Sequence, residues 1–253
     1  MNDKLATLVE IQPRTPLLRT RERLAAGHLT VGFIGGSITD PRPGHNWPES
    51  VGDWLVDQFP DARIQVENAA IGATGSDLAV FRAQRDLIDC GCDLIFIEFA
   101  VNDQGAPTEK RNRTREGLVR KLLADDPGRD LVFTYTFSQS MYDEMMAGKM
   151  PVSIAEFEVI SEHYGISSVW MGLHALREVM RGLMTWEHWL PDGIHPQSRG
   201  SLSYGTAVNT LLADELVGAG QPTGKSRGSL PRPLNGANWE GAYALNWDAI
   251  CTA

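Results

Sequence analysis

The sequence predicts an α/β protein built around an open parallel sheet of five strands. Short runs rich in β-branched and aromatic residues alternate with longer segments of helical period, which is the pattern of repeated βα units. The third apolar run, residues 93–100, is almost continuously hydrophobic, as expected for a parallel strand buried on both faces. A chain of 253 residues, 42% of them hydrophobic, is long enough to bury one full core.

The elements follow from these runs in chain order. Strands are expected at residues 29–34, 64–69, 93–100, 130–137 and 167–171. Helices are expected at residues 47–58, 76–88, 108–124, 152–164, 173–182 and 197–217. Residues 1–27 then form an N-terminal extension with a short basic helix, and residues 28–217 form the main domain. From Gly218 the composition turns to Gly, Pro, Ser and Asn, so residues 218–253 are a tail that either straps across the domain or begins a further module.

Composition excludes several classes of partner. The net charge of -9 and the pI near 5.1 disfavour nucleic acid and anionic membrane surfaces, which attract clusters of Lys and Arg. No segment approaches the roughly 18–20 apolar residues that span a bilayer, and the N-terminus does not resemble a secretion signal. We therefore expect a cytoplasmic protein, although a signal peptide that had been removed would leave the same sequence. The oligomeric state is not indicated.

The residues that directly follow the first three predicted strands are small or polar. They are residues 35–37, 70–72 and 101–103. In an open parallel sheet, ligands bind outside the carboxyl ends of the strands, where the strand order reverses. Three loops that are far apart in the sequence are thus expected to meet in one cleft.

Two segments contain the groups needed for nucleophilic acyl transfer. Ser37 follows an apolar strand and two glycines, which allow a sharp turn and leave the hydroxyl uncrowded. Asp192 and His195 stand three residues apart in a loop, a spacing that lets the carboxylate reach the imidazole Nδ1 and leaves Nε2 free to face a serine. Taken alone, Ser37 is also consistent with an ordinary turn serine. Asp192 and His195, taken alone, are also consistent with an Asp that stabilises a turn beside a surface His.

The joint pattern resembles the SGNH (GDSL-like) hydrolase family, whose four blocks supply a Ser, a Gly, an Asn and an Asp-x-x-His in that order. The matching residues are Ser37, Gly72, Asn102, Asp192 and His195. The resemblance implies a three-layer α/β/α, flavodoxin-like fold. It also implies a nucleophile, Ser37, with His195 as base and Asp192 as its partner. The oxyanion hole would comprise the N–H groups of Ser37 and Gly72 and the Asn102 amide.

The chain departs from the family pattern at two positions. The usual Gly-Asp-Ser of the first block is Gly35-Gly36-Ser37, which resembles a variant branch, and the glycine two residues before Asn102 is Ala100. Neither change removes a reactive group, so both bear on substrate preference more than on activity.

Other sites are weaker. The segment from Ser201 to Gly205 lacks the first glycine of a nucleophile elbow, and no phosphate loop or dinucleotide fingerprint is present. The histidines show no paired spacing for zinc, so we predict no metal and no cofactor. His45 lies in a loop, residues 40–47, that is expected to overhang the cleft, where it either contacts substrate or is an ordinary exposed residue.

The expected function is a serine esterase acting on short acyl esters, chiefly acetyl, of a carbohydrate or another polar alcohol. The small or polar residues after the first three strands favour a short acyl group; they include Gly36, Thr39, Ala70, Ala73, Thr74, Asp103 and Gln104. Two alternatives stay open, because fold does not determine substrate. One is a lipase or thioesterase with a longer acyl pocket, and the other is a non-catalytic carbohydrate-binding relative.

Overall fold

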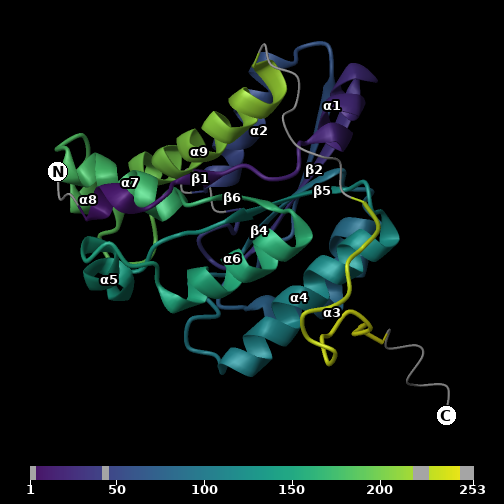
Figure 1. Cartoon of the computed structure of the whole chain (residues 1–253). Coiled ribbons are helices and arrows are strands. Elements are labelled where there is room, and N and C mark those ends of the chain that lie inside the picture. Colours follow the sequence, from purple (N-terminus) through teal and green to yellow (C-terminus); the bar gives the residue numbers. More distant parts are fainter. Residues whose placement is uncertain (1–3, 42–45, 219–227, 246–253) are drawn as a thin grey trace.

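The computed structural model describes residues 4–41, 46–218 and 228–245, and its centre is a six-stranded sheet in the order β1-β6-β5-β4-β2-β3 (Figure 1). The strands are β1 (Ile11–Gln12), β2 (His28–Gly35), β3 (Arg63–Asn68), β4 (Leu94–Glu98), β5 (Asp130–Thr134) and β6 (Ser167–Val169). Strands β2 to β6 are parallel, which confirms the predicted five-stranded parallel sheet. Strand β1 is not among the predicted strands; it pairs antiparallel with β6 and adds a sixth strand at that edge.

Helices cover both faces of the sheet, so the predicted three layers are present (Figure 1). Helices α2, α7 and α9 pack together on one face, and α3, α4 and α6 pack on the other. The helices are α1 (Leu18–Ala25), α2 (Trp47–Gln58), α3 (Ser76–Ala83), α4 (Thr108–Asp125), α5 (Tyr142–Met146), α6 (Val152–Tyr164), α7 (Met171–Met180), α8 (Trp186–Trp189) and α9 (Ser198–Leu212). One π-helical turn continues each of α3 and α9, at Gln84–Ile88 and Ala213–Val217.

An aromatic cluster fixes β2 beside β4. Phe33 of β2 stacks on Phe96 of β4 with ring centroids 5.1 Å apart, and Trp47 at the start of α2 packs edge-on against both rings. All three side chains are fully buried. Large buried aromatic side chains contribute strongly to core stability, and edge-to-face pairs add to that. The cluster therefore holds the carboxyl ends of β2 and β4 together, with Gly35 opposite Glu98.

The residues before β2 extend the same sheet and core. Besides β1, this segment contributes α1, where the Thr20 N–H and hydroxyl both donate to the Asp130 carboxylate at 2.8 Å. The described part of the tail lies along α3 and α4: the N–H groups of Leu234 and Asn235 donate to Glu116 (Figure 1). The expected boundaries at residues 27 and 218, and a module beyond the tail, stay predictions.

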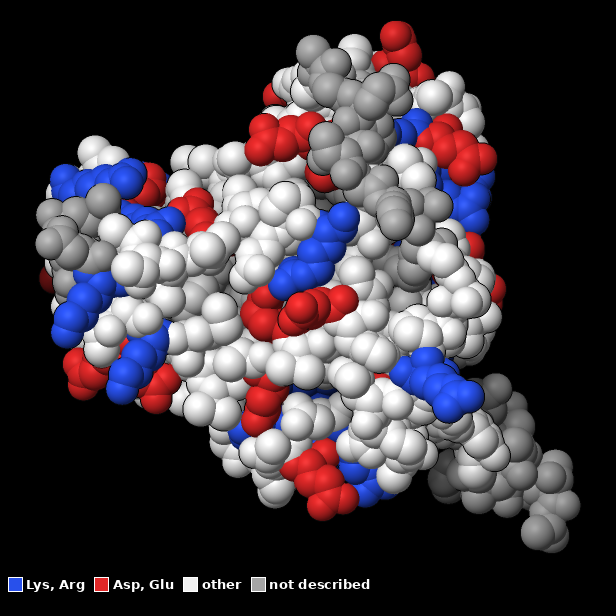
Figure 2. Space-filling view, in the orientation of Figure 1, with Lys and Arg blue, Asp and Glu red and all other residues white. Residues whose placement is uncertain are grey.

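Charged groups of both signs share the surface. Figure 2 shows Lys and Arg side chains lying beside Asp and Glu over the face in view. Among the described residues, no helix combines the length and the apolar character needed to cross a bilayer.

Candidate functional site

The turn that carries Ser37 begins where β2 ends. The N–H groups of Thr39 and Asp40 donate to the Gly36 carbonyl at 3.1 and 3.0 Å, which closes the turn and leaves Ser37 partly exposed. A Cβ added at Gly36 would lie 2.2–2.4 Å from the amide atoms of Asn102. No real side chain tolerates that distance, so this turn requires glycine at position 36 as long as Asn102 keeps its place.

A continuous chain of hydrogen bonds links Ser37, His195 and Asp192. The Ser37 Oγ lies 2.8 Å from His195 Nε2, and His195 Nδ1 lies 2.7 Å from an Asp192 carboxylate oxygen. With the carboxylate accepting at Nδ1, the neutral imidazole carries its proton there and presents an unprotonated Nε2 to the serine. The three residues come together from the end of β2 and from the loop before α9.

The Asp192–His195 turn is held by its own backbone. The other Asp192 carboxylate oxygen accepts from the N–H groups of Ile194 and His195, at 2.9 and 2.7 Å. Gly193, which directly follows Asp192, has a φ of +81°, a conformation that strongly favours glycine. Partial burial alone would raise the pKa of Asp192. The hydrogen bonds from the His195 N–H, the His195 ring and the Ile194 N–H outweigh this effect and lower the pKa to about 2. The carboxylate thus stays ionised across the physiological range.

Three hydrogen-bond donors beside Ser37 are free. Within residues 4–41, 46–218 and 228–245, no partner is found for the N–H groups of Ser37 and Gly72 or for the Asn102 side-chain amide. The Ile71 N–H donates to the Gly35 carbonyl at 3.1 Å and holds the Gly72 loop against the Ser37 turn. Unpaired donors next to a serine hydroxyl would suit an oxygen that becomes negatively charged during a reaction at that serine.

The residue after Gly72 is strained. Ala73 has a φ of +59°, the one positive φ outside glycine among the described residues. This left-handed conformation costs a non-glycine residue of the order of 1 kcal/mol or more, and such strain is concentrated at functional sites. The strain at Ala73 lies next to Gly72, which carries one of the free donors.

Glu98 lies directly beneath the Ser37 turn and was not singled out from the sequence. Its side chain is fully buried and accepts from the hydroxyls of Thr39 at 3.1 Å and Thr136 at 2.8 Å. The Trp47 indole in turn donates to the Thr39 hydroxyl at 3.1 Å. Burial raises the pKa of Glu98 to about 7, against the opposing effect of hydrogen bonds from Thr136, Thr39 and the Gly36 N–H. A single carboxyl group in an otherwise apolar strand was the available signal.

Several residues expected at the cleft lie elsewhere. Thr39 is buried against Glu98 and does not line an open cleft. Asp103 is largely buried in an ion pair with Arg115, although it borders a cavity that Asn102 also lines. The hydroxyls of Ser201 and Ser203 are buried in α9. His45 lies outside the described residues, and its expected contact with substrate stays a prediction. No group of His, Cys, Asp and Glu in the described part of the chain could hold a metal ion.

Solved esterase structures resemble this chain. A two-domain esterase active on acetylated mannans covers 94% of the chain with 29% sequence identity and a TM-score of 0.76. Its complex with mannopentaose gives 27% identity and a TM-score of 0.75. The chain spans only 62% and 61% of the length of these two structures. No protein-family model matches the sequence, and a search of curated proteins finds no match.

More distant structures share the fold alone. An acetyl xylan esterase from Geobacillus stearothermophilus is 22% identical, with a TM-score of 0.58 over 72% of this chain and 93% of its own. A structure from Parabacteroides merdae assigned as a GDSL-like lipase is 16% identical, with a TM-score of 0.60 over 79% of this chain and 96% of its own. The architecture is therefore the SGNH one, with β1 as an addition to the predicted five strands.

The raised pKa of Glu98 predicts a pH-dependent effect of Glu98→Gln on stability. The pKa is about 7 in the folded protein against an ordinary value of 4.5, so burying the ionised form costs stability increasingly from about pH 4.5 to pH 7. Gln cannot ionise and escapes that cost. The difference in melting temperature, Glu98→Gln minus wild type, should therefore be more positive at pH 8 than at pH 5. An equal difference at both pH values would show that Glu98 does not titrate in this range.

Proposed function

We propose that the chain is a serine esterase of the SGNH (GDSL-like) type that removes short acyl groups, chiefly acetyl, from carbohydrates. The observation that carries this proposal is the hydrogen-bonded chain from Ser37 through His195 to Asp192 beside three free donors. The similarity at 29% identity to an esterase active on acetylated mannans supports a carbohydrate ester as substrate.

In the proposed reaction, Ser37 is the nucleophile. Its oxygen attacks the acyl carbon while its proton moves to His195 Nε2, and Asp192 stabilises the imidazolium that forms. The imidazolium then gives the proton to the departing alcohol oxygen, which leaves an acyl group on Ser37. A water molecule then repeats the sequence: the water gives a proton to His195 Nε2 while the water oxygen bonds to the acyl carbon. The bond between the acyl carbon and Ser37 Oγ breaks, the imidazolium returns the proton to Ser37 Oγ, and the carboxylic acid departs.

The three free donors act on the carbonyl oxygen. In both halves of the reaction this oxygen becomes negative in a tetrahedral intermediate, and the N–H groups of Ser37 and Gly72 and the Asn102 amide would hold it. Because these donors are fixed in the folded protein, they need no reorganisation when the charge appears. The small residues beside them, Gly36 and Ala73, suit a short acyl group.

The nucleophile is tested by covalent labelling. A fluorophosphonate should modify Ser37 and no other serine, because among the described residues only this hydroxyl faces an imidazole nitrogen, at 2.8 Å. Ser37→Ala should fold normally and lose both labelling and nearly all turnover. Peptide mapping by mass spectrometry identifies the modified residue. Ser203→Ala, which removes a buried hydroxyl, is the matched control, and label on Ser201 or Ser203 would refute the assignment.

The oxyanion donors are tested at Asn102 by two independent changes. Asn102→Ala removes one donor and should lower kcat by roughly 100- to 1000-fold with little change in KM. Gly36→Ala should lower kcat as well, because its Cβ would displace the same amide. Gly52→Ala is the control, since its Cβ would meet only Val66 at an ordinary 3.6 Å. A raised KM at constant kcat would instead make Asn102 a ground-state binding residue.

Substrate class is tested with two series of esters. For aryl esters, kcat/KM should fall from acetate to octanoate, because an oversize chain overpacks a small pocket at a cost of roughly 1–3 kcal/mol. Acetate release from acetylated manno- and xylo-oligosaccharides should be detected alongside. An optimum at octanoate with no acetate release would favour a lipase or thioesterase, and absence of turnover with every ester would favour a non-catalytic relative.

A further inference from the structure

A polar cavity of about 220 Å³ adjoins the proposed active site. It lies between the loop that leads into α3 and the segment from Asn102 into the first turns of α4. Its lining residues are Ala73, Gly75, Ser76, Asp77, Asn102, Asp103, Ala106, Lys110, Arg111 and Thr114. Asn102 is shared between this cavity and the Ser37 turn, so a molecule in the cavity would lie next to the reacting ester.

The rim of the cavity carries one anionic and one cationic side chain. Asp77 of α3 and Lys110 of α4 form an ion pair at 2.6 Å, and their side chains are 39% and 44% exposed. The Lys110 contact lowers the pKa of Asp77, which keeps the carboxylate ionised. A pair this exposed contributes little to stability. Its carboxylate oxygens and ammonium hydrogens remain accessible to a bound molecule.

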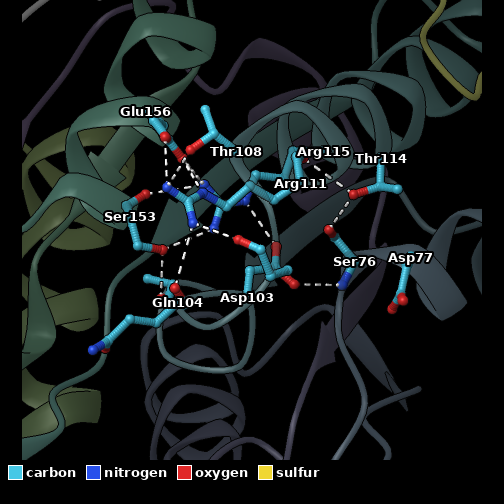
Figure 3. Close-up of polar contacts among 12 residues, drawn as sticks. Ser76, Asp77, Asp103, Gln104, Thr108, Arg111, Thr114, Arg115, Ser153 and Glu156 are labelled. Atoms are coloured by element: carbon cyan, nitrogen blue, oxygen red, sulfur yellow. Dashed lines mark hydrogen bonds and ion pairs between the residues drawn. The ribbon is translucent and has the colours of Figure 1, made fainter.

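Hydrogen bonds and ion pairs link the side chains of the wall behind the rim (Figure 3). Arg115 is completely buried, pairs with Asp103 at 2.8 Å, and donates to Ser153. The second Asp103 carboxylate oxygen accepts from the Ser76 N–H at 2.9 Å. The Ser76 and Thr114 hydroxyls lie 2.6 Å apart in the same wall. These groups satisfy one another and hold the cavity open without filling it.

The charges on the rim and in the wall cancel. Each acidic side chain has a basic partner: Asp77 pairs with Lys110, Asp103 with Arg115, and Glu156 with Arg111. A cavity of this kind offers strong donors and acceptors but no net charge. It suits a neutral ligand rich in hydroxyl groups. A long apolar chain would leave these polar groups without solvent or partners, and a polyanion would find no excess positive charge.

We propose that this cavity binds a sugar ring of the alcohol part of the substrate, and that Asp77 and Lys110 determine the preference for carbohydrate esters. The proposal rests on the proposed esterase function and adds to it the place where the saccharide is recognised. Adjacent hydroxyls of a sugar ring would accept from the Lys110 ammonium and donate to the Asp77 carboxylate. Hydrogen bonds to charged groups are the stronger ones, so their loss is measurable.

The test compares two substrates, 4-nitrophenyl acetate and an acetylated manno-oligosaccharide. In Asp77→Asn and Lys110→Met, the ratio of kcat/KM for the oligosaccharide to that for the aryl ester should fall roughly 10- to 100-fold, as expected for losing one hydrogen bond to a charged group. Most of the change should lie in the KM of the oligosaccharide. Glu109→Gln is the matched control, because it breaks an exposed ion pair with Arg113 on the same helix outside the cavity.

A second measurement separates this proposal from the esterase function. Binding of mannopentaose to Ser37→Ala is measured by calorimetry, with and without Asp77→Asn, and the Kd should rise roughly 10- to 100-fold. The rise in the Kd for mannopentaose is expected even if no acetate is released from any substrate. An unchanged substrate ratio and an unchanged Kd would overturn the proposal, as would an equal loss on both esters, which would show general damage to the active site. Absence of turnover of both esters by the wild-type protein would instead refute the esterase function.

Discussion

The last paired residues of β2 and β4, Gly35 and Glu98, determine the geometry of the site. Beyond this pair the chain after β2 turns back, with Ser37 at the surface and Thr39 directed down onto Glu98. The chain after β4 carries Asn102 over Gly36, at a distance that only a glycine allows. The pairing of these two strands therefore sets the positions of Ser37 and Asn102, the proposed nucleophile and oxyanion donor. The aromatic cluster around Phe33 stabilises that pairing.

The sequence predicted the helices and strands whose buried apolar residues recur at a regular spacing along the chain. β4 is buried at every position, and the helices on both faces show the expected alternation of apolar and polar residues, so their positions were correct within a few residues. Strand β1 was missed, because a two-residue strand carries no period and forms through tertiary contacts. Its pairing with β6 is extended by the Trp170 N–H, which donates to the Glu10 carbonyl at 2.7 Å.

Within the site, predictability depended on whether a contact was local. Asp192 and His195 are three residues apart, and the turn between them could be anticipated from their spacing and from Gly193. Glu98 could not be assigned, because its partners come from the Ser37 turn and from the segment after β5. The ion pair of Asp77 and Lys110 joins two helices at a sequence separation of 33, and only the folded chain brings them together.

Helix α4 connects the proposed sugar cavity to the C-terminal tail. Its first turns contribute Lys110 to the rim, and its later turns hold residues 228–245: Glu116 accepts from the tail backbone, and the tail passes so close to Gly117 that a Cβ there would lie 2.6 Å from the Trp239 nitrogen. The tail thus fixes the helix that carries one wall of the cavity. The proposed sugar cavity and the described part of the tail therefore share α4, whereas Ser37, His195 and Asp192 lie on other elements.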